Sequence, residues 1–104
     1  MPIGSGTVAV QLVQVCVLLW ARPGATDALI TYEDKVLALL GDHGGRVLQR
    51  ARTDGEEGAP TEVQLIEFTS RAGYDGFLTD ERRTALSAER DAVAHTDLYP
   101  VELV

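Results

Sequence analysis

The stretch Val8–Trp20 constrains the fold of this 104-residue chain more than any other part of its sequence. All of its residues except Gln11 and Gln14 are apolar. Because side chains along a strand point alternately to the two sides of a sheet, both faces of this segment are apolar and both need cover. We therefore expect a central strand with helices of this chain on one side. The chain is long enough for one domain but not for a second full layer, so a second copy is the expected cover of the other side.

The charge balance disfavours two classes of partner. Lysine and arginine together number 9 and aspartate and glutamate 16, which gives a formal net charge of -7. A nucleic acid backbone or an anionic membrane would be repelled on average, so neither is expected as a partner. Every basic residue except Lys35 is an arginine, a side chain well suited to holding a small anion.

The single cysteine, Cys16, excludes an internal disulfide, and its place in an apolar strand indicates a buried thiol. A reducing compartment is consistent with such a residue. The apolar run is shorter than the roughly 18 residues that cross a bilayer, and no basic residue precedes it as in a signal peptide. We expect a cytoplasmic protein.

After a loose lead-in at residues 1–7 and the first strand, the pattern predicts a helix. It begins at Thr26 or Asp27 and ends at the glycine corner 42–45. Its apolar stripe, with spacings of three and four residues, comprises Leu29, Tyr32, Val36, Leu40 and His43. Its opposite side carries Glu33, Asp34 and Lys35.

Two strands are predicted next, at residues 46–52 and 61–69. The former carries a basic face and therefore suits an outer position. That face comprises Arg46, Leu48, Arg50 and Arg52. The latter has apolar residues on both faces and suits a second central position. The polar loop between them, residues 53–60, is expected to be mobile.

The C-terminal part predicts helices and a last strand. Ser70 caps a short helix, and Thr79 or Asp80 starts a second helical piece over residues 81–94. The last strand, residues 98–104, contains a proline, which has no N–H to donate and therefore belongs at a sheet edge.

This order of elements predicts an α+β fold of the ferredoxin-like βαββαβ type, in one domain spanning residues 1–104. With right-handed crossovers, the four antiparallel strands follow the order 4-1-3-2, and both helices cover one face. That order places the two apolar strands at the centre and the proline-containing strand at an edge.

A set of short motifs spans most of residues 8–103. The motifs are Tyr32-Glu33, His43-Gly44-Gly45-Arg46 leading to Arg50, Thr61-Glu62-Val63, Ile66-Glu67-Phe68, and Leu78-Thr79-Asp80 with Arg82-Arg83. Together they resemble the dimeric α+β barrel proteins, and most of all their short uncharacterised bacterial members with a His-Gly-Gly corner. Ala51-Arg52 depart from that pattern, because a glycine usually follows the arginine of the second strand.

The resemblance implies a homodimer in which two ferredoxin-like subunits pack their sheets face to face into a barrel. It also implies a pocket in each subunit, between the sheet and the helices, for a small organic ligand. Related families with this architecture include cofactor-independent monooxygenases of aromatic polyketides, lactone isomerases and haem-degrading enzymes.

The first helix carries two candidates for catalysis. The helix dipole favours a protonated His43, which could act as a general acid or base, or could instead bond a nearby carbonyl and fix the helix-to-strand corner. Tyr32 lies about three turns earlier on the same helix face, so the two side chains could line one cavity. Alternatively, Tyr32 is a core residue with a solvated hydroxyl.

The strands supply the other candidates. Arg46 and Arg50, on one face of the second strand, could clamp a substrate carboxylate, or could pair with Glu62 or Glu67 on the neighbouring strand. Glu67 shares a face with apolar residues of the third strand. It could therefore point inward as a buried base, or be structural if an arginine pairs with it.

The remaining polar residues indicate no cofactor. Asp80, Arg82 and Arg83 are interpreted as a helix cap and a solvated first turn. The two histidines and the one cysteine lie far apart, so no metal or haem is expected. Two functions remain open. One is a cofactor-independent enzyme, of monooxygenase or isomerase type, acting on a small organic or aromatic metabolite; the other is a non-catalytic dimer with a ligand-binding or structural role.

Overall fold

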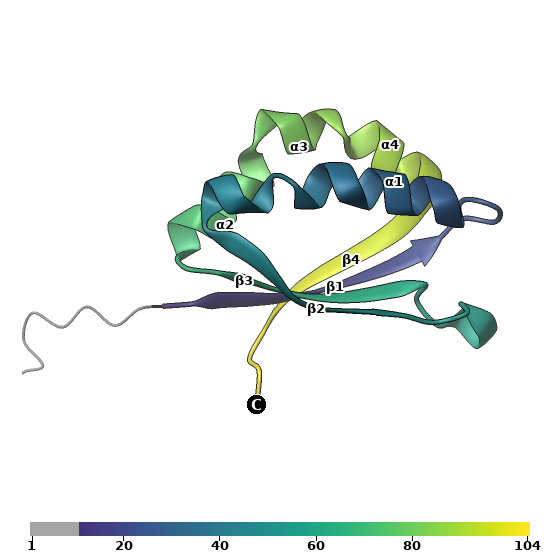
Figure 1. Cartoon of the computed structure of the whole chain (residues 1–104), viewed down its shortest axis with the longest axis horizontal. Coiled ribbons are helices and arrows are strands. Elements are labelled where there is room, and N and C mark those ends of the chain that lie inside the picture. The colour runs from purple at the N-terminus through teal and green to yellow at the C-terminus, as the bar shows by residue number, and fades with distance from the viewer. Residues whose placement is uncertain (1–10) are drawn as a thin grey trace, which may run out of the picture.

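Four antiparallel strands form one sheet in the order β2-β3-β1-β4, and the α-helices lie together on one side of it (Figure 1). The computed structural model describes residues 11–104. The strands are β1 (Val13–Ala21), β2 (Gly45–Arg52), β3 (Glu62–Phe68) and β4 (Ala94–Val101). The α-helices are α1 (Thr26–Leu37), α2 (Arg71–Thr79), α3 (Glu81–Ala85) and α4 (Ser87–Val93), with short 3₁₀ turns η1 (Leu40–His43) and η2 (Glu56–Gly58). The predicted ferredoxin-like α+β fold and its strand order are confirmed.

The predicted central strand is β1, which pairs with β3 on one side and β4 on the other. Its residues Val15, Val17 and Leu19 face the helices and are almost fully buried. The start of the predicted segment, residues 8–10, and the predicted lead-in, residues 1–7, lie outside the described residues. β3 occupies the second central position, and β4, which contains Pro100, is an edge strand as predicted.

An irregularity in β2 separates residues that the sequence placed on one face. Val47 is opposite Ile66, whereas Gln49 is opposite Leu65, so the register shifts between them. A bulge of this kind reverses which side of the sheet the following residues face. Arg46 therefore lies on the open side of the sheet and Arg50 on the helix side, and the prediction that they share a face is wrong.

The first helix is shorter than predicted. α1 ends at Leu37, and the chain reaches the glycine corner through the 3₁₀ turn η1. Gly41 and Asp42 are poor helix formers, which favours an early end. Gly44, with φ of 68°, closes the turn in the left-handed conformation that glycine tolerates best.

The C-terminal helical region is divided. Ser70 caps α2 by accepting a hydrogen bond from the Gly73 N–H at 3.0 Å, as predicted. Asp80 caps α3 through the Arg82 N–H at 2.8 Å, also as predicted. The single helix predicted over residues 81–94 is wrong, because the chain breaks at Leu86 into α3 and α4. β4 consequently begins at Ala94, earlier than predicted.

The loop between β2 and β3 contains η2 and is tied to the sheet. The Trp20 indole N–H donates to the Gly58 carbonyl at 2.9 Å, and the Thr53 N–H donates to the Thr61 carbonyl at 3.0 Å. These bonds fix both the tip and the base of the loop to β1 and β3. The predicted mobility of the loop stays a prediction.

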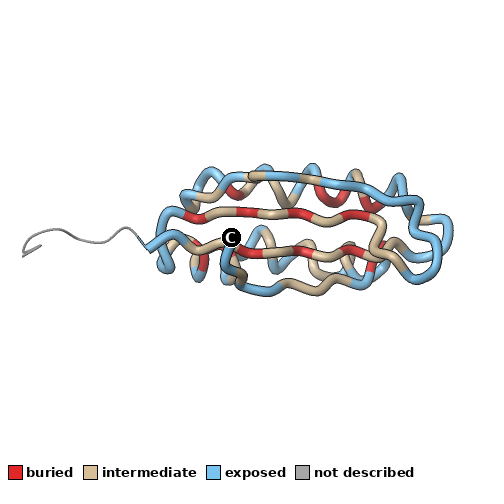
Figure 2. The backbone as a smooth tube through the Cα atoms, turned by 90° about the horizontal axis from the view of Figure 1, so that it is seen from below, coloured by how far each residue is buried: buried red, intermediate tan, exposed pale blue. Residues whose placement is uncertain are grey.

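The side of the sheet away from the helices has no covering layer within residues 11–104. Figure 2 looks onto this open face, where buried and partly exposed residues alternate along the two central strands. Its apolar side chains include Cys16, Leu18, Val63, Leu65 and Tyr99. Tyr99 is 52% exposed. None of the helices in the described part of the chain is long and apolar enough to cross a membrane.

Candidate functional site

A cleft lies between the sheet and the helices and has two connected parts. The inner part is a cavity of about 40 Å³ with mainly apolar walls from the sheet, α1 and α2. A water molecule needs about 10–15 Å³ on this measure, so the cavity exceeds the space of one or two waters. The outer part measures about 270 Å³ and lies beside α4 and β4. Arg83, Arg90, Thr96 and Leu98 line both parts, and we call the region that these four residues share the passage.

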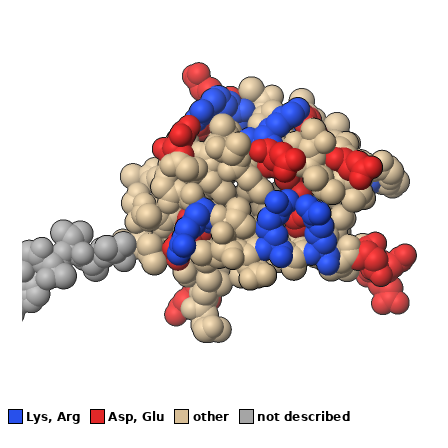
Figure 3. Space-filling view, viewed as in Figure 1, with Lys and Arg blue, Asp and Glu red and all other residues tan. Residues whose placement is uncertain are grey.

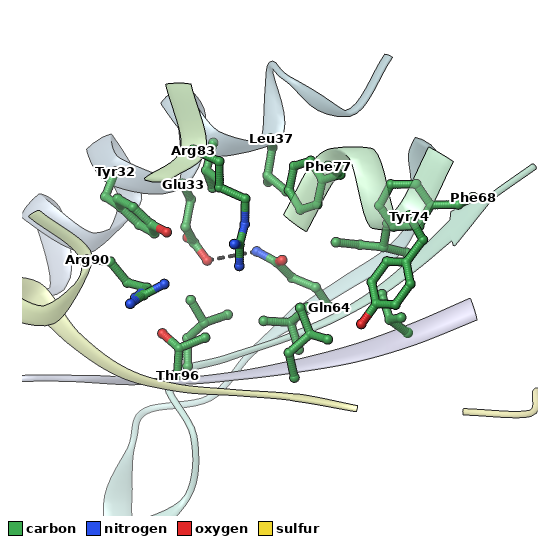
Figure 4. Close-up of a pocket in the computed structure, with 16 residues that line it drawn as sticks. Tyr32, Glu33, Leu37, Gln64, Phe68, Tyr74, Phe77, Arg83, Arg90 and Thr96 are labelled. Atoms are coloured by element: carbon green, nitrogen blue, oxygen red, sulfur yellow. Dashed lines mark hydrogen bonds between the residues drawn. The ribbon is translucent and has the colours of Figure 1, made fainter. Parts of the chain in front are cut away.

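Polar groups gather at the end of the inner cavity that meets the outer cleft. Figure 4 shows Tyr32, Arg90 and Thr96 on one side of the cavity and the aromatic rings of Phe77 and Tyr74 on the other. The Thr96 hydroxyl is buried and has no hydrogen-bond partner in the described structure. Tyr32 is only 5% exposed, and burial raises the pKa of its phenol. The cavity therefore combines an apolar end with a polar end.

Arg83 extends from α3 into this cavity, although the sequence placed it in a solvated turn. One of its terminal nitrogens donates to the Leu78 carbonyl at 3.2 Å, and its guanidinium lies 5.2 Å from the centre of the Phe77 ring. Burial lowers the pKa of Arg83, and the nearby positive charge of Arg90 lowers it further. Within residues 11–104 no carboxylate forms an ion pair with Arg83.

A buried cluster of carboxyl and amide groups forms the wall where α1 meets β3. Glu33 and Glu62 are each 1% exposed and Gln64 is 3% exposed. The Gln64 amide donates to Glu33 Oε1 at 2.8 Å and to Glu62 Oε2 at 2.6 Å. Arg50 reaches both carboxyl groups, at 3.3 Å from Glu33 and 3.0 Å from Glu62. Arg52 donates to Glu62 at 2.6 Å.

The two carboxyl groups of this cluster differ in their affinity for a proton. Burial, together with the adjacent Glu62, raises the pKa of Glu33 to about 8. Burial also opposes ionisation of Glu62, but its hydrogen bonds to Glu33, Gln64 and the two arginines outweigh that effect and lower its pKa to about 2. One shared proton therefore resides on Glu33 while Glu62 is ionised, as is typical of two close carboxyl groups.

Glu33 was not among the predicted site residues, because it was placed on the outer side of the first helix. Glu33 follows Leu29 by four residues, and residues at that spacing share a helix face. On β3, Glu62 and Gln64 alternate with the buried Ile66 and so share its helix-facing side. These two periodicities are the signal in the sequence that could have identified the cluster.

His43 lies outside the cleft, at the corner between η1 and α3. Its Nε2 is 2.7 Å from Asp80 Oδ2, and its ring packs edge-on against Phe77 at 6.2 Å. Arg82 and His43 together hold the pKa of Asp80 well below its usual range. His43 and Tyr32 do not line a common cavity in the described structure. The partner of His43 is the Asp80 carboxylate rather than the carbonyl of the structural alternative, and a corner-fixing role stays a prediction.

Glu67 and Arg46 lie on the open face of the sheet rather than in the cleft. Gln14 donates to Glu67 at 3.0 Å, Arg46 pairs with the same carboxylate at 3.1 Å, and both contacts lower the pKa of Glu67. On the face seen in Figure 3, acidic and basic side chains likewise lie against each other. Of the five residues predicted for the site, only Tyr32 lines the cleft, and Arg50 lies behind its wall, against Glu33. Both arginines have the carboxylate partners given as their structural alternative.

Comparison with known structures agrees with this architecture. The RPA0582 protein of unknown function from Rhodopseudomonas palustris is 16% identical, with a TM-score of 0.74 over 91% of this chain and 84% of that chain. SnoaB, a cofactor-independent oxygenase from Streptomyces nogalater, is 10% identical, with a TM-score of 0.70 over 89% and 93%. The NE2512 protein of unknown function from Nitrosomonas europaea is 22% identical, with a TM-score of 0.65 over 93% of both chains. At these identities the likeness shows the fold alone.

These likenesses, with the topology of the sheet, define the class by its fold: the chain is a ferredoxin-like α+β protein, as its sequence predicted. Within that class it belongs to the family described as a domain of unknown function (DUF1330), which matches residues 22–104. No match was found among curated proteins.

Proposed function

We propose that this protein is a cofactor-independent enzyme that transfers a proton to or from carbon in a small organic molecule bound in the cleft. The observation that carries the proposal is the position of Glu33, a buried carboxyl group on the wall of an apolar cavity. A carboxyl group whose pKa lies near neutrality can both donate and accept a proton at physiological pH. Isomerisation needs both steps.

The neighbours of Glu33 suit it to this role. Glu62 and Gln64 hold its carboxyl group in one orientation, and Arg50 balances the negative charge that forms when the proton leaves. Because the walls of the cavity are mainly apolar, the proton has few competing acceptors among the lining residues. Tyr32, which precedes Glu33 in α1 and also lines the cavity, can donate a hydrogen bond to an oxygen of the bound molecule.

We propose further that the working form is a homodimer. The open sheet face presents partly exposed apolar side chains from its two central strands, among them Cys16, Leu18 and Leu65. A second copy of the chain would remove them from water on both subunits, and burial of apolar surface is the main driving force of such association. We expect the ion pair of Arg46 and Glu67, which lies on the same face, to help fix how the two subunits align.

A second candidate function is non-catalytic binding of a small molecule. The ion pairs of the buried cluster favour this alternative. Arg50 and Arg52 both pair with Glu62, and these contacts could serve only to join β2 to β3. Under this alternative Glu33 only donates a hydrogen bond to Glu62 and has no role in catalysis. Replacing Glu33 would then leave ligand binding intact.

Hydrogen–deuterium exchange at carbon separates the two functions. The protein is incubated in D₂O with a panel of ketones and 2-oxo acids, and loss of their C–H signals is followed by NMR. The proposal predicts exchange by the wild type above the uncatalysed rate and loss of nearly all of that excess in Glu33→Gln. Glutamine imitates the protonated carboxyl in shape and charge, so this variant stays folded.

Two control variants test whether a loss of exchange is specific to Glu33. Asp75→Asn removes a carboxyl group that also pairs with an arginine, Arg71 at 3.0 Å, but lies on the surface, so exchange should persist. Glu67→Gln tests the carboxylate that the sequence favoured. Equal activity of Glu33→Gln and the wild type, or a loss confined to Glu67→Gln, would contradict the proposal.

A further inference from the structure

The geometry points to a small organic acid as the ligand of the cleft, with its carboxylate held by Arg83 and Arg90 and its apolar part in the inner cavity. This inference rests on the proposed function in one respect, because it assigns the substrate class to the same cleft. The residues that carry it are distinct from Glu33 and can be tested separately.

Positive charge is concentrated at the passage between the two parts of the cleft. Arg83 and Arg90 line both parts, and Arg22 lines the outer one. The chain as a whole has a formal charge of -7, so this grouping runs against the overall balance. An anion is the ligand that such a passage attracts.

The two arginines keep hydrogen-bond donors free for a ligand. Arg83 uses one donor on the Leu78 carbonyl, and Arg90 pairs through Nε with Asp91 at 3.1 Å, which leaves its terminal nitrogens without a partner in the described structure. Asp91 is itself 68% exposed at the side chain, so it neutralises little of the charge within the passage. A planar carboxylate matches the paired donors of a guanidinium.

Two hydroxyl groups complete the polar end. Thr96 Oγ1 is buried and without a hydrogen-bond partner in the described residues, which is an unfavourable state for a polar atom. Tyr32 directs its hydroxyl towards the same region in Figure 4. A carboxylate at the passage would accept hydrogen bonds from both and so satisfy Thr96.

The inner cavity indicates an apolar body for the ligand. Its far end is walled by Phe68, Tyr74 and Phe77, and only a small share of its lining is polar. Inorganic anions have no group to place there, and the outer part, at about 270 Å³, is near the lower limit of about 300 Å³ for ligand pockets, which disfavours large polyanions. A monocarboxylate with a small apolar body matches the character of both ends; an aromatic ring would have to widen the inner cavity beyond its present volume of about 40 Å³.

Calorimetric titration of the full chain with defined probes tests the inference. The acids are benzoate and hexanoate; benzamide and hexanamide keep the shape without the charge, and inorganic phosphate keeps the charge without the apolar body. We expect saturable binding of at least one acid, and binding of amides and phosphate weaker by about tenfold or more, since charge-assisted hydrogen bonds are lost or the apolar contact is absent.

Single substitutions in the cleft test which side chains contact the carboxylate of the ligand. Arg90→Gln and Thr96→Val should each weaken binding of the acid by about tenfold, since each removes a donor from the carboxylate. Arg71→Gln is the matched control for the arginines. Arg71 lies over the Tyr74 ring at 5.7 Å, as Arg83 lies over Phe77, but it is outside the cleft. Its effect should stay within about twofold. For Arg83→Gln, the affinity for the acid is interpreted together with the midpoint of thermal unfolding, because Arg83 also donates a hydrogen bond to the Leu78 carbonyl.

The outcomes separate this inference from the proposed function. Failure of both acids to bind at millimolar concentration, equal binding of the amides, equal binding of phosphate, or unchanged affinity in both Arg90→Gln and Thr96→Val would overturn the inference. Acids that bind to the wild type and equally to Glu33→Gln, with no exchange in D₂O, would support it while contradicting the proposed proton transfer. Exchange of neutral ketones without binding of any acid would support the proposed proton transfer and contradict the inference of an organic acid ligand.

Discussion

The side-chain amide of Gln64 donates a hydrogen bond to Glu33 Oε1 at 2.8 Å, so that the first helix and a central strand of the sheet meet at a buried carboxyl group. Gln64 donates to Glu62 as well, at 2.6 Å, and thereby holds the two carboxyl groups next to each other. Two carboxyl groups this close favour a state with one proton between them. The proposed chemistry depends on that state.

The stability of the wild type should decrease as pH rises from about 4.5 to about 8, relative to Glu33→Gln. Glu33 has a pKa of 4.5 in the unfolded chain and about 8 in the folded one. Between these values the unfolded chain loses this proton while the folded chain keeps it, so ionisation favours unfolding. Glu62 acts in the opposite sense, but its contribution is lost only as pH falls from its ordinary range towards about 2.

Thermal or urea unfolding across that pH range checks this prediction. The difference in free energy of unfolding between wild type and Glu33→Gln should change steadily with pH. Asp75→Asn, which alters an exposed carboxyl group, should run parallel to the wild type. Parallel curves for wild type and Glu33→Gln would show that Glu33 titrates normally.

Thr96→Val should stabilise the protein without ligand. The substitution keeps the shape of the side chain and removes a buried hydroxyl that lacks a partner in the described structure, which is worth about 1 kcal/mol. Thr84→Val is the comparison, because the Thr84 hydroxyl is exposed and donates to the Asp80 carbonyl at 3.2 Å. A loss of stability in Thr96→Val, measured by urea unfolding, would mean that the hydroxyl is already hydrogen-bonded.

His43→Ala should lower the midpoint of thermal unfolding by several degrees and leave carbon exchange unchanged. The imidazole joins η1 to α3 through Asp80 at 2.7 Å, and alanine leaves that carboxylate with one partner fewer. His95→Ala is the matched control, since His95 is 62% exposed at the side chain and its pair with Asp97 contributes little. Protein concentration must be equal in all samples, because the midpoint of a dimer depends on it. Lost exchange with unchanged stability would return His43 to the catalytic candidates.

Leu65→Glu should convert the proposed dimer into a monomer. Leu65 lies on the open face opposite Cys16 in β1, so a charge there would be buried by a second copy. Sedimentation equilibrium should give twice the chain mass for the wild type and dissociation at least about tenfold more favourable for the variant. Ala88→Glu, on the exposed surface of α4, should leave the mass unchanged. A monomeric wild type would exclude the dimer.

The sequence predicted the fold well because the signals for it are regular. The apolar residues on both faces of β1 and the proline in β4 each identify a position in the sheet, and the resulting strand order is confirmed. The site was harder to predict for three local reasons. The bulge after Val47 leaves no mark in composition. The inward position of Arg83 depends on its contacts with Leu78 and Phe77 in the preceding helix. Glu33 resembles a surface residue unless its contact with β3 is known.

A titration of the glutamate side-chain carboxyl carbons by ¹³C NMR tests the central claim most directly. The assignment of Glu33 follows from the signal that is absent in Glu33→Gln. We expect this carbon to titrate several pH units above those of the exposed glutamates, and its midpoint to move when benzoate binds in the cleft. A Glu33 carboxyl that titrates with the exposed glutamates, near a pH of about 4.3, would contradict the account, because no protonated group would then be available for the proposed transfer.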